Sequence, residues 1–260
     1  MEIFSVFALT CSKGELLIET STVASKLVSW LTKQVESANM QGVVFGLSGG
    51  IDSAVVAGLA KRAFPHKALA VCLPCHSNPL DREHAALTAE TFGLEMLTVD
   101  LSSAFDQLVS TLALGQQGRP VVPELTLANV KPRLRMTALY YYASIHAYLV
   151  LGTSNRSELT IGYFTKYGDG GVDLMPLAGL VKTEVRELAK YLGVPQVIID
   201  KPPTAGLWAG QTDEGEMGLT YRELDEYILI GDAAPHIKER VDSLAATSTH
   251  KKRLPPIPRL

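Results

Sequence analysis

Short apolar runs alternate along this chain with longer segments in which apolar residues recur at helical spacing. The runs of strand length cover residues 43–47, 68–73, 95–99 and 149–151. The segments of helical spacing cover residues 21–35, 52–63, 81–92, 129–148 and 182–192. No hairpin dipeptide joins one run to the next, so each connection has to cross over the sheet through a helix. The pattern predicts an α/β fold with a doubly wound, mostly parallel sheet that is flanked by helices.

Residues 1–260 are predicted to form one domain, because neither an internal repeat nor a linker interrupts the pattern. Residues 1–20 are expected to form an N-terminal arm or packing strand. A signal peptide is not expected, because Glu2 stands where such a peptide has basic residues and no small-residue cleavage site follows. Residues 251–260 contain three prolines and are predicted to form a flexible tail.

Composition narrows the range of partners and locations. The chain has 24 Lys and Arg residues against 27 Asp and Glu residues, so its net charge is −3, which argues against non-specific nucleic-acid binding. No apolar run approaches the ~18–20 residues that a membrane span requires. Three cysteines do not form the framework of a secreted disulfide-rich protein. We therefore expect a cytoplasmic protein that partners neither nucleic acid nor membrane, with a local cationic site for any polyanionic ligand.

A glycine-rich loop between the first strand run and the next helix carries the clearest chemical signal. It consists of Gly46, Leu47, Ser48, Gly49, Gly50, Ile51, Asp52 and Ser53. In this order the backbone N–H groups of the turn and of the helix N-terminus face one point, where they can hold an anion. The glycines allow close approach of a phosphate, the two serines can donate hydroxyls, and Asp52 can hold a metal ion. Neither the Walker motif nor the G-x-G-x-x-G dinucleotide fingerprint is present.

The string Ser-Gly-Gly-Ile-Asp-Ser resembles the pyrophosphate-binding loop of ATP pyrophosphatases of the adenine-nucleotide α-hydrolase type. Those enzymes have a Rossmann-like fold and cleave ATP to AMP and pyrophosphate. Further segments resemble ammonia-dependent NAD synthetases of this group, namely residues 129–136, 152–173, 176–177, 180–183, 201–205, 211–214 and 221–225. The resemblance covers about residues 20–253. Pro132 departs from it, because the family more often has Ala there, and this departure predicts a helix start or a kink.

The resemblance implies a ligase that makes NAD from deamido-NAD. ATP adenylates the nicotinate carboxylate and releases pyrophosphate, and ammonia then displaces AMP to form the amide. ATP, deamido-NAD and ammonia are the expected substrates. The carboxylate and the triphosphate repel each other, so the reaction is expected to need Mg²⁺ as well as cationic side chains.

Particular residues are expected to carry this chemistry. Asp52 and Lys182 are the catalytic candidates, and Asp52 and Glu158 are the candidate ligands of Mg²⁺. By resemblance, ATP binds the loop of residues 46–53 together with Thr153, Lys182 and Thr204. By resemblance also, deamido-NAD contacts Arg133, Lys166, Asp173, His250 and Lys251.

Quaternary structure and nitrogen donor are expected to follow the family as well. Between Arg133 and Tyr148 the apolar residues lie all round the helix, which needs cover on more than one side and favours a homodimer with the site at its interface. Burial of this helix within one subunit remains the alternative. Ammonia is the expected donor, because glutamine-using relatives carry an amidase domain where this chain has about twenty residues before its first helix.

Two other function classes stay open on the sequence. Cys72-Leu73-Pro74-Cys75-His76 has the C-x-x-C-H spacing of a haem or metal site, although packing at a strand end is the favoured interpretation. A sulfur-transfer enzyme that modifies tRNA shares the pyrophosphatase loop and carries paired cysteines. A non-enzymatic nucleotide-binding subunit is the third class, but it would not need both Asp52 and Glu158.

Overall fold

The computed structural model describes residues 19–114, 122–204, 206, 208 and 210–258. The arm expected over residues 1–20 therefore lies almost entirely outside the described residues. The same holds for the end of the tail expected over residues 251–260, at residues 259–260. No helix among the described residues is long and apolar enough to cross a lipid bilayer.

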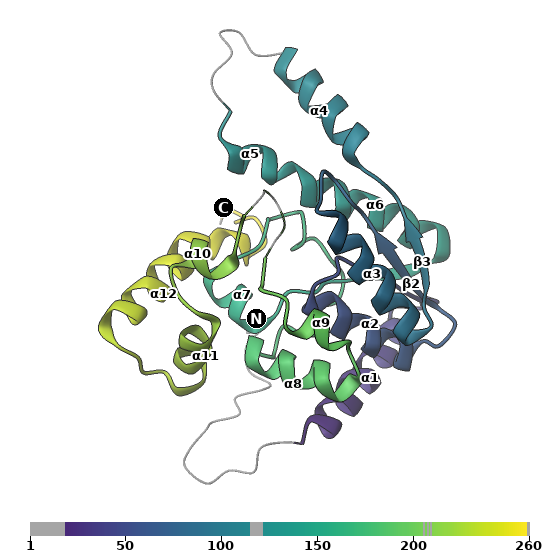
Figure 1. Ribbon diagram of the computed structural model, residues 1–260, viewed down its shortest axis with the longest axis horizontal. Coiled ribbons are helices and arrows are strands. Elements are labelled where there is room, and N and C mark those ends of the chain that lie inside the picture. The colour runs from purple at the N-terminus through teal and green to yellow at the C-terminus, as the bar shows by residue number, and fades with distance from the viewer. Residues whose placement is uncertain (1–18, 115–121, 205, 207, 209, 259–260) are drawn as a thin grey trace.

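The described residues contain one parallel sheet, as the alternating pattern predicts (Figure 1). Its strands are β1 (Gly42–Gly46), β2 (Ala68–Cys72), β3 (Glu95–Thr98) and β4 (Tyr148–Leu151). The spatial order is β3-β2-β1-β4, and each neighbouring pair is parallel. The chain leaves β1 toward β2 and β3, and later returns to the other side of β1 as β4. This reversal opens a crevice at the carboxyl ends of β1 and β4, where ligands bind in open α/β sheets.

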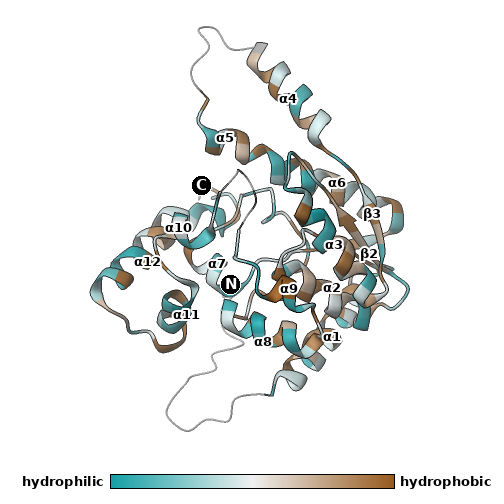
Figure 2. Ribbon diagram, in the orientation of Figure 1, coloured by the Kyte–Doolittle hydropathy of each residue, from teal (hydrophilic) through white to brown (hydrophobic). Residues whose placement is uncertain are grey.

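Helices cover both faces of the sheet, which confirms the doubly wound class. One layer consists of α1 (Thr20–Ser37), α2 (Ile51–Ala63), α3 (Pro79–Phe92) and α8 (Lys182–Leu192). Its core contains side chains that are completely buried, including Leu31, Phe45, Leu59 and Leu188. The opposite layer is centred on α6 (Val130–His146), whose Leu139 and Ala143 pack on β1, β2 and β4. In Figure 2 the ribbon of β2 is brown, because every residue of this strand is hydrophobic.

The remaining elements extend these layers or form a third cluster. The extensions are α4 (Ser102–Leu114), α5 (Glu124–Ala128) and α9 (Gln196–Ile199). The third cluster packs α7 (Arg156–Ile161), α10 (Asp213–Met217), α11 (Tyr221–Ile230) and α12 (Pro235–Ser248), with the 3₁₀ turn η1 (Thr249–Lys251) after them. Pro132 lies in the first turn of α6, where a missing N–H costs no helical hydrogen bond.

Gly162 ties α7 closely to α12. It ends α7 with a φ of +72°, and a Cβ atom on it would lie only 2.0 Å from Cβ of Ser248. Gly193 ends α8 in the same left-handed conformation, with a φ of +86°, but a Cβ atom there would meet nothing within 4 Å. Both positions favour glycine because of their positive φ, but only at Gly162 would an added Cβ atom also clash with a neighbouring helix.

We expect Gly193→Ala to lower the free energy of unfolding by about 1 kcal/mol, because an L-residue is strained at positive φ. Gly162→Ala should cost about 1–3 kcal/mol more, because the added methyl group overpacks the contact with α12. Urea titration of both variants measures the difference. Equal losses in the two variants would contradict the tight α7–α12 packing.

Candidate active site

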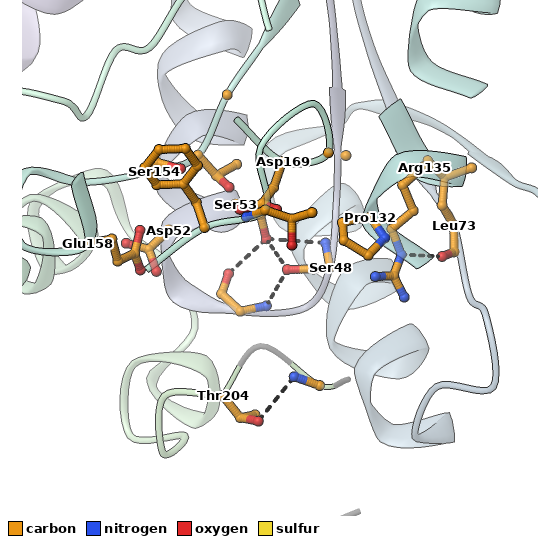
Figure 3. Close-up of a pocket in the computed structure, with 18 of the residues that line it drawn as sticks. Ser48, Asp52, Ser53, Leu73, Pro132, Arg135, Ser154, Glu158, Asp169 and Thr204 are labelled. Carbon is orange, nitrogen blue, oxygen red and sulfur yellow. Dashed lines mark hydrogen bonds between the residues drawn. The ribbon is translucent and has the colours of Figure 1, made fainter. Parts of the chain in front are cut away.

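A cavity of about 450 Å³ opens at the carboxyl ends of β1, β2 and β4 (Figure 3). Most of the residues predicted to bind ATP line it. These are Gly46, Leu47, Ser48, Gly50, Ile51, Asp52, Ser53, Thr153, Lys182 and Thr204. Gly49, the remaining residue of the loop, packs against α3 instead, next to Asp81 and His84. The position of this cavity is the one that the strand order dictates.

The phosphate loop is held in shape by its own hydroxyls. Ser53 Oγ lies 2.9 Å from Gly50 O, to which it donates, and 3.2 Å from Ser48 N, from which it accepts. The two serine hydroxyl oxygens are 3.1 Å apart. Dashed lines in Figure 3 mark the hydrogen bonds of Ser48 and Ser53. Gly49 has a φ of +76°, and a Cβ atom on it would lie 2.2 Å from Asp81 O. Hydrogen bonds within the loop and the close contact of Gly49 with α3 therefore fix its shape, and residues of the start of α2 line the cavity.

Asp52, Glu158 and Lys182 meet at one wall of this cavity. Lys182 Nζ lies 2.5 Å from Asp52 Oδ2 and 3.6 Å from Glu158 Oε1. Asn155, the N-cap of α7, donates from Nδ2 to Asp52 Oδ1 over 3.0 Å. The side chain of Lys182 is only 3% exposed. Three helix starts, those of α2, α7 and α8, thus bring together the two catalytic candidates and the two candidate metal ligands.

The charges in this group do not balance. Burial raises the pKa of Glu158 above its ordinary value, the negative charge of Asp52 raises it further, and Lys182 opposes the rise. Burial by itself would lower the pKa of Lys182, but Asp52 and Glu158 together raise it, so the amine stays charged. The ammonium of Lys182 therefore interacts with the side chains of both Asp52 and Glu158, and a third acidic residue, Asp213, lies nearby. Two acidic side chains beside one ammonium are a donor set that suits Mg²⁺, which prefers a few carboxylate oxygens together with phosphate oxygens and water.

Asp213 and Tyr221, two buried residues of the third cluster, also belong to the site, although the sequence did not single them out. Tyr221 Oη donates to Asp213 Oδ2 over 3.0 Å and reaches Glu158 Oε1 at 3.4 Å. The Tyr221 ring centroid lies 4.9 Å from Lys182 Nζ, in a cation–π contact. The resemblance to NAD synthetases covered both positions as parts of longer segments, and only the fold shows what they touch.

The residues expected to bind deamido-NAD do not all lie in one place. Arg133 Nε donates to Lys166 O over 3.4 Å, and Lys166 Nζ donates to His250 O over 2.8 Å, so these three lie together. None of the three lines the cavity described above. Lys251 does line it, but its ammonium donates to two backbone carbonyls at 3.0 and 2.9 Å, those of Gly162 and Phe164.

Asp173 lies at the sheet, away from the cavity wall. Its Oδ1 accepts a hydrogen bond of 2.9 Å from Tyr140 Oη, and its Oδ2 accepts one of 2.8 Å from Val150 N. Burial raises the pKa of Tyr140, and the hydrogen bond to Asp173 raises it further. This carboxylate therefore joins α6 to β4.

The profile of the NAD synthase family matches residues 23–255 of the chain. A relative from Carboxydothermus hydrogenoformans, named NH(3)-dependent NAD(+) synthetase, is 53% identical over 236 residues, which are 90% of this chain and 96% of the relative. The chain belongs to the NAD synthase family. The family, the enzyme class and the reaction predicted from the resemblance are thereby confirmed.

Solved structures of NAD synthase relatives agree with the fold. The structure of NMN synthetase from Francisella tularensis superimposes with a TM-score of 0.88 at 38% identity, over 94% of this chain and 100% of that one. The NH3-dependent NAD synthetase from Campylobacter jejuni, in complex with nitrate, superimposes with a TM-score of 0.76 at 30% identity, also over 94% and 100%. The α/β fold class is confirmed by these superpositions as well as by the sheet itself.

In this NAD synthase, the paired cysteines lie at the end of β2, where Cys72 borders the cavity. Cys72 and Cys75 are both free and buried. Burial raises the pKa of each thiol, although Arg135 counteracts the rise in both. Among the described residues, no group of three or more His, Cys, Asp or Glu side chains is arranged to hold a metal ion. Sulfur transfer needs a reactive thiolate, which these two environments disfavour.

We expect Cys72 and Cys75 to react with iodoacetamide at pH 7 at least ~10-fold more slowly than free cysteine, because both the raised pKa and the burial lower the accessible thiolate. Mass spectrometry of the peptide that carries both residues measures the labelling rate, and the urea-unfolded chain is the control. Labelling of the folded chain as fast as the unfolded one would return the sulfur-transfer hypothesis to consideration.

Proposed function

We propose that the cavity at the phosphate loop is the place where this NAD synthase activates its substrate carboxylate with ATP. The observation that carries the proposal is the meeting of Asp52, Glu158 and Lys182 beside a preformed anion loop. A carboxylate resists nucleophiles because of its negative charge. Conversion to an acyl adenylate removes that charge and supplies a stable leaving group.

In the first step a nicotinate carboxylate oxygen of deamido-NAD attacks the α-phosphorus of ATP. The new O–P bond forms as the bond between the α-phosphorus and the bridging oxygen breaks, and pyrophosphate leaves. The N–H groups at the start of α2 and the ammonium of Lys182 face this departing charge. Thr153 and Thr204, both on the cavity wall, are suited to hydrogen-bond the nucleotide. In the second step the ammonia nitrogen attacks the acyl carbon, the bond to AMP breaks, and the nitrogen loses a proton.

Asp52 and Glu158 would hold Mg²⁺ at this site. When bound, Mg²⁺ would neutralise phosphate charge next to these carboxylates. The Lys182 ammonium, which pairs with Asp52 and Glu158, would also contact phosphate oxygens of ATP at this wall of the cavity.

Deamido-NAD is assigned to the surface beside the cavity. Arg133 and Lys166 supply cations for its pyrophosphate, and His250 and Lys251 lie at the adjoining turn. Asp173 is exposed, and each of its carboxylate oxygens accepts one hydrogen bond, from Tyr140 or Val150, so a further acceptor site remains for a hydroxyl of the ligand. The similarity to the NMN synthetase of F. tularensis favours a second candidate, in which the acceptor is the corresponding mononucleotide.

The reaction can be tested directly by mass spectrometry of the products. With Mg-ATP, ammonium and deamido-NAD we expect NAD, AMP and pyrophosphate in equal amounts. At fixed total ammonium the rate should rise with pH, because only unprotonated ammonia is a nucleophile, and glutamine should not substitute. Faster amidation of nicotinate mononucleotide than of deamido-NAD would favour the second candidate. Equal rates with glutamine would refute ammonia as the donor.

Asp52→Asn is expected to lower kcat at least ~10²-fold, because the amide keeps the shape of the side chain but removes the charge that the reaction needs. Circular dichroism should show a folded variant. Asp106→Asn is the matched control, since Asp106 is exposed and pairs with His76 outside the cavity. Wild-type turnover by folded Asp52→Asn protein would contradict the catalytic and metal-binding roles.

We also propose a homodimer that uses α6. Tyr141 and Ile145, one helical turn apart, are 63% and 58% exposed, so an apolar strip of α6 is uncovered in the subunit. Leu139, by contrast, packs into the core below the sheet and is only 8% exposed. Substitution of Leu139 would therefore unfold the subunit and cannot report on the dimer.

A single domain over residues 1–260 and a cytoplasmic location stay predictions.

Sedimentation at micromolar concentration tests the dimer. We expect wild-type protein to sediment as a species of twice the chain's 28.1 kDa, and Tyr141→Asp to give monomers, because a buried unpaired carboxylate opposes the contact. Tyr191→Asp, on the exposed surface of α8, is the control and should stay dimeric. Fully active monomers of the wild type would refute the dimer.

A further inference from the structure

The first turn of α8 is buried, and its backbone N–H groups need acceptors. Val181, the N-cap residue, is completely buried and has no side-chain acceptor, and Lys182 is 2% exposed. Buried N–H groups without partners are costly, so other elements have to supply the missing acceptors. Lys182 N donates to Ser157 Oγ on α7 over 3.1 Å, and Thr183 N donates to Asp225 on α11 over 2.7 Å.

The carboxylate of Asp225 accepts hydrogen bonds from both of these groups, the Ser157 hydroxyl and the N–H of Thr183. Oδ2 of Asp225 accepts from Thr183 N, and its Oδ1 accepts from the Ser157 hydroxyl over 2.5 Å. Asp225 is only 2% exposed. A negative charge at a helix N-terminus also interacts favourably with the helix dipole. Asp225 therefore caps α8 from a different helix and ties α7 to it through Ser157.

The two helix starts that Asp225 joins are the ones that carry chemistry. Ser157 directly precedes Glu158 in the sequence. The hydroxyl oxygen of Ser157 also accepts a hydrogen bond from the backbone N–H of Lys182. Tyr221 lies four residues before Asp225, so both project from the same face of α11. Tyr221 touches the carboxylate of Glu158 and the ammonium of Lys182. One face of α11 thus contacts the side chains of Glu158 and Lys182 through Tyr221, and the first turn of α8 through Asp225.

We propose that Asp225 is a positioning residue for the adenylation step. It acts through Ser157 and the first turn of α8, and it keeps the Lys182 ammonium and the Glu158 carboxylate aligned with Asp52. It contacts no reacting atom. This inference deepens the proposed function and rests on it, because it assumes that Lys182 faces the departing pyrophosphate.

Asp225→Asn changes the hydrogen bonding with little change in shape. If the single amide oxygen keeps the bond from Thr183 N, the amide NH₂ faces Ser157 Oγ, so the charged bond that the Ser157 hydroxyl donates is lost and its oxygen has to reorient. A small displacement of Lys182 should slow the chemical step strongly, since misplacements of about 1 Å cost on the order of 10²-fold. We expect the adenylation rate to fall at least ~10-fold, with KM for ammonia unchanged.

A pyrophosphate burst separates positioning from folding. Enzyme is mixed with Mg-ATP and deamido-NAD without ammonia, and pyrophosphate is measured by rapid quench. The burst amplitude counts folded, competent sites, and the burst rate reports adenylation in each site. For Asp225→Asn we expect an amplitude close to that of the wild type and a rate at least ~10-fold lower. Asp242→Asn is the control, because this exposed carboxylate accepts a hydrogen bond from Tyr227 on α11, as Asp225 accepts its own, but lies on α12 outside the Ser157–Lys182 connection.

Two results would overturn the inference. One is an Asp225→Asn burst that loses amplitude only, with a wild-type rate in the remaining sites, since that is the effect of a purely structural residue. The other is an unchanged burst rate in Ser157→Ala, which removes the link between Asp225 and Lys182 N and decides the question if Asp225→Asn does not fold. Slower bursts in both variants that do not add in the double variant would support the shared pathway. A wild-type enzyme without a burst would refute the proposed function itself.

Discussion

The buried ammonium of Lys182 is the constraint on which the site depends. A lysine at 2% exposure keeps its charge only if carboxylates compensate for lost hydration, and here Asp52 and Glu158 do so from two other helices. Because each partner belongs to a different helix, the relative placement of α2, α7 and α8 is fixed by electrostatics as well as by apolar packing. The cavity has its shape because these three helix starts converge on one charge.

Much of the fold could be predicted because it depends on local patterns. The strand runs are continuous because both faces of the sheet are covered, and the helices alternate with them for the same reason. The phosphate loop is equally local, since strand, glycines and helix follow one another within eight residues. Asp52 was singled out from this loop, and Glu158 and Lys182 from the family resemblance; the structure brings the three side chains together.

The remaining site residues act across distances in the chain that no spacing encodes. Asp225 meets Ser157 across 68 residues, and Tyr221 meets Glu158 across 63, without a motif that links them. Periodicity also failed to say which face of α6 is covered. Leu139 and Tyr141 are both part of an apolar helix surface in sequence, but one packs on the sheet and the other is exposed. Only tertiary packing distinguishes them.

The separation of Asp52 from Lys182 has a consequence for the order in which this protein is made. The two residues are 130 positions apart, and in the pairing of β1 with β4 Gly42 lies opposite Tyr148, more than a hundred residues later. On the ribosome, the phosphate loop and its carboxylate emerge while α7, α8 and the whole third cluster are still unsynthesised. Pairings over such intervals form slowly because a long loop must close first. A nascent chain therefore holds a nearly complete nucleotide cradle that lacks its cation, and competence for catalysis arrives with the last third of translation.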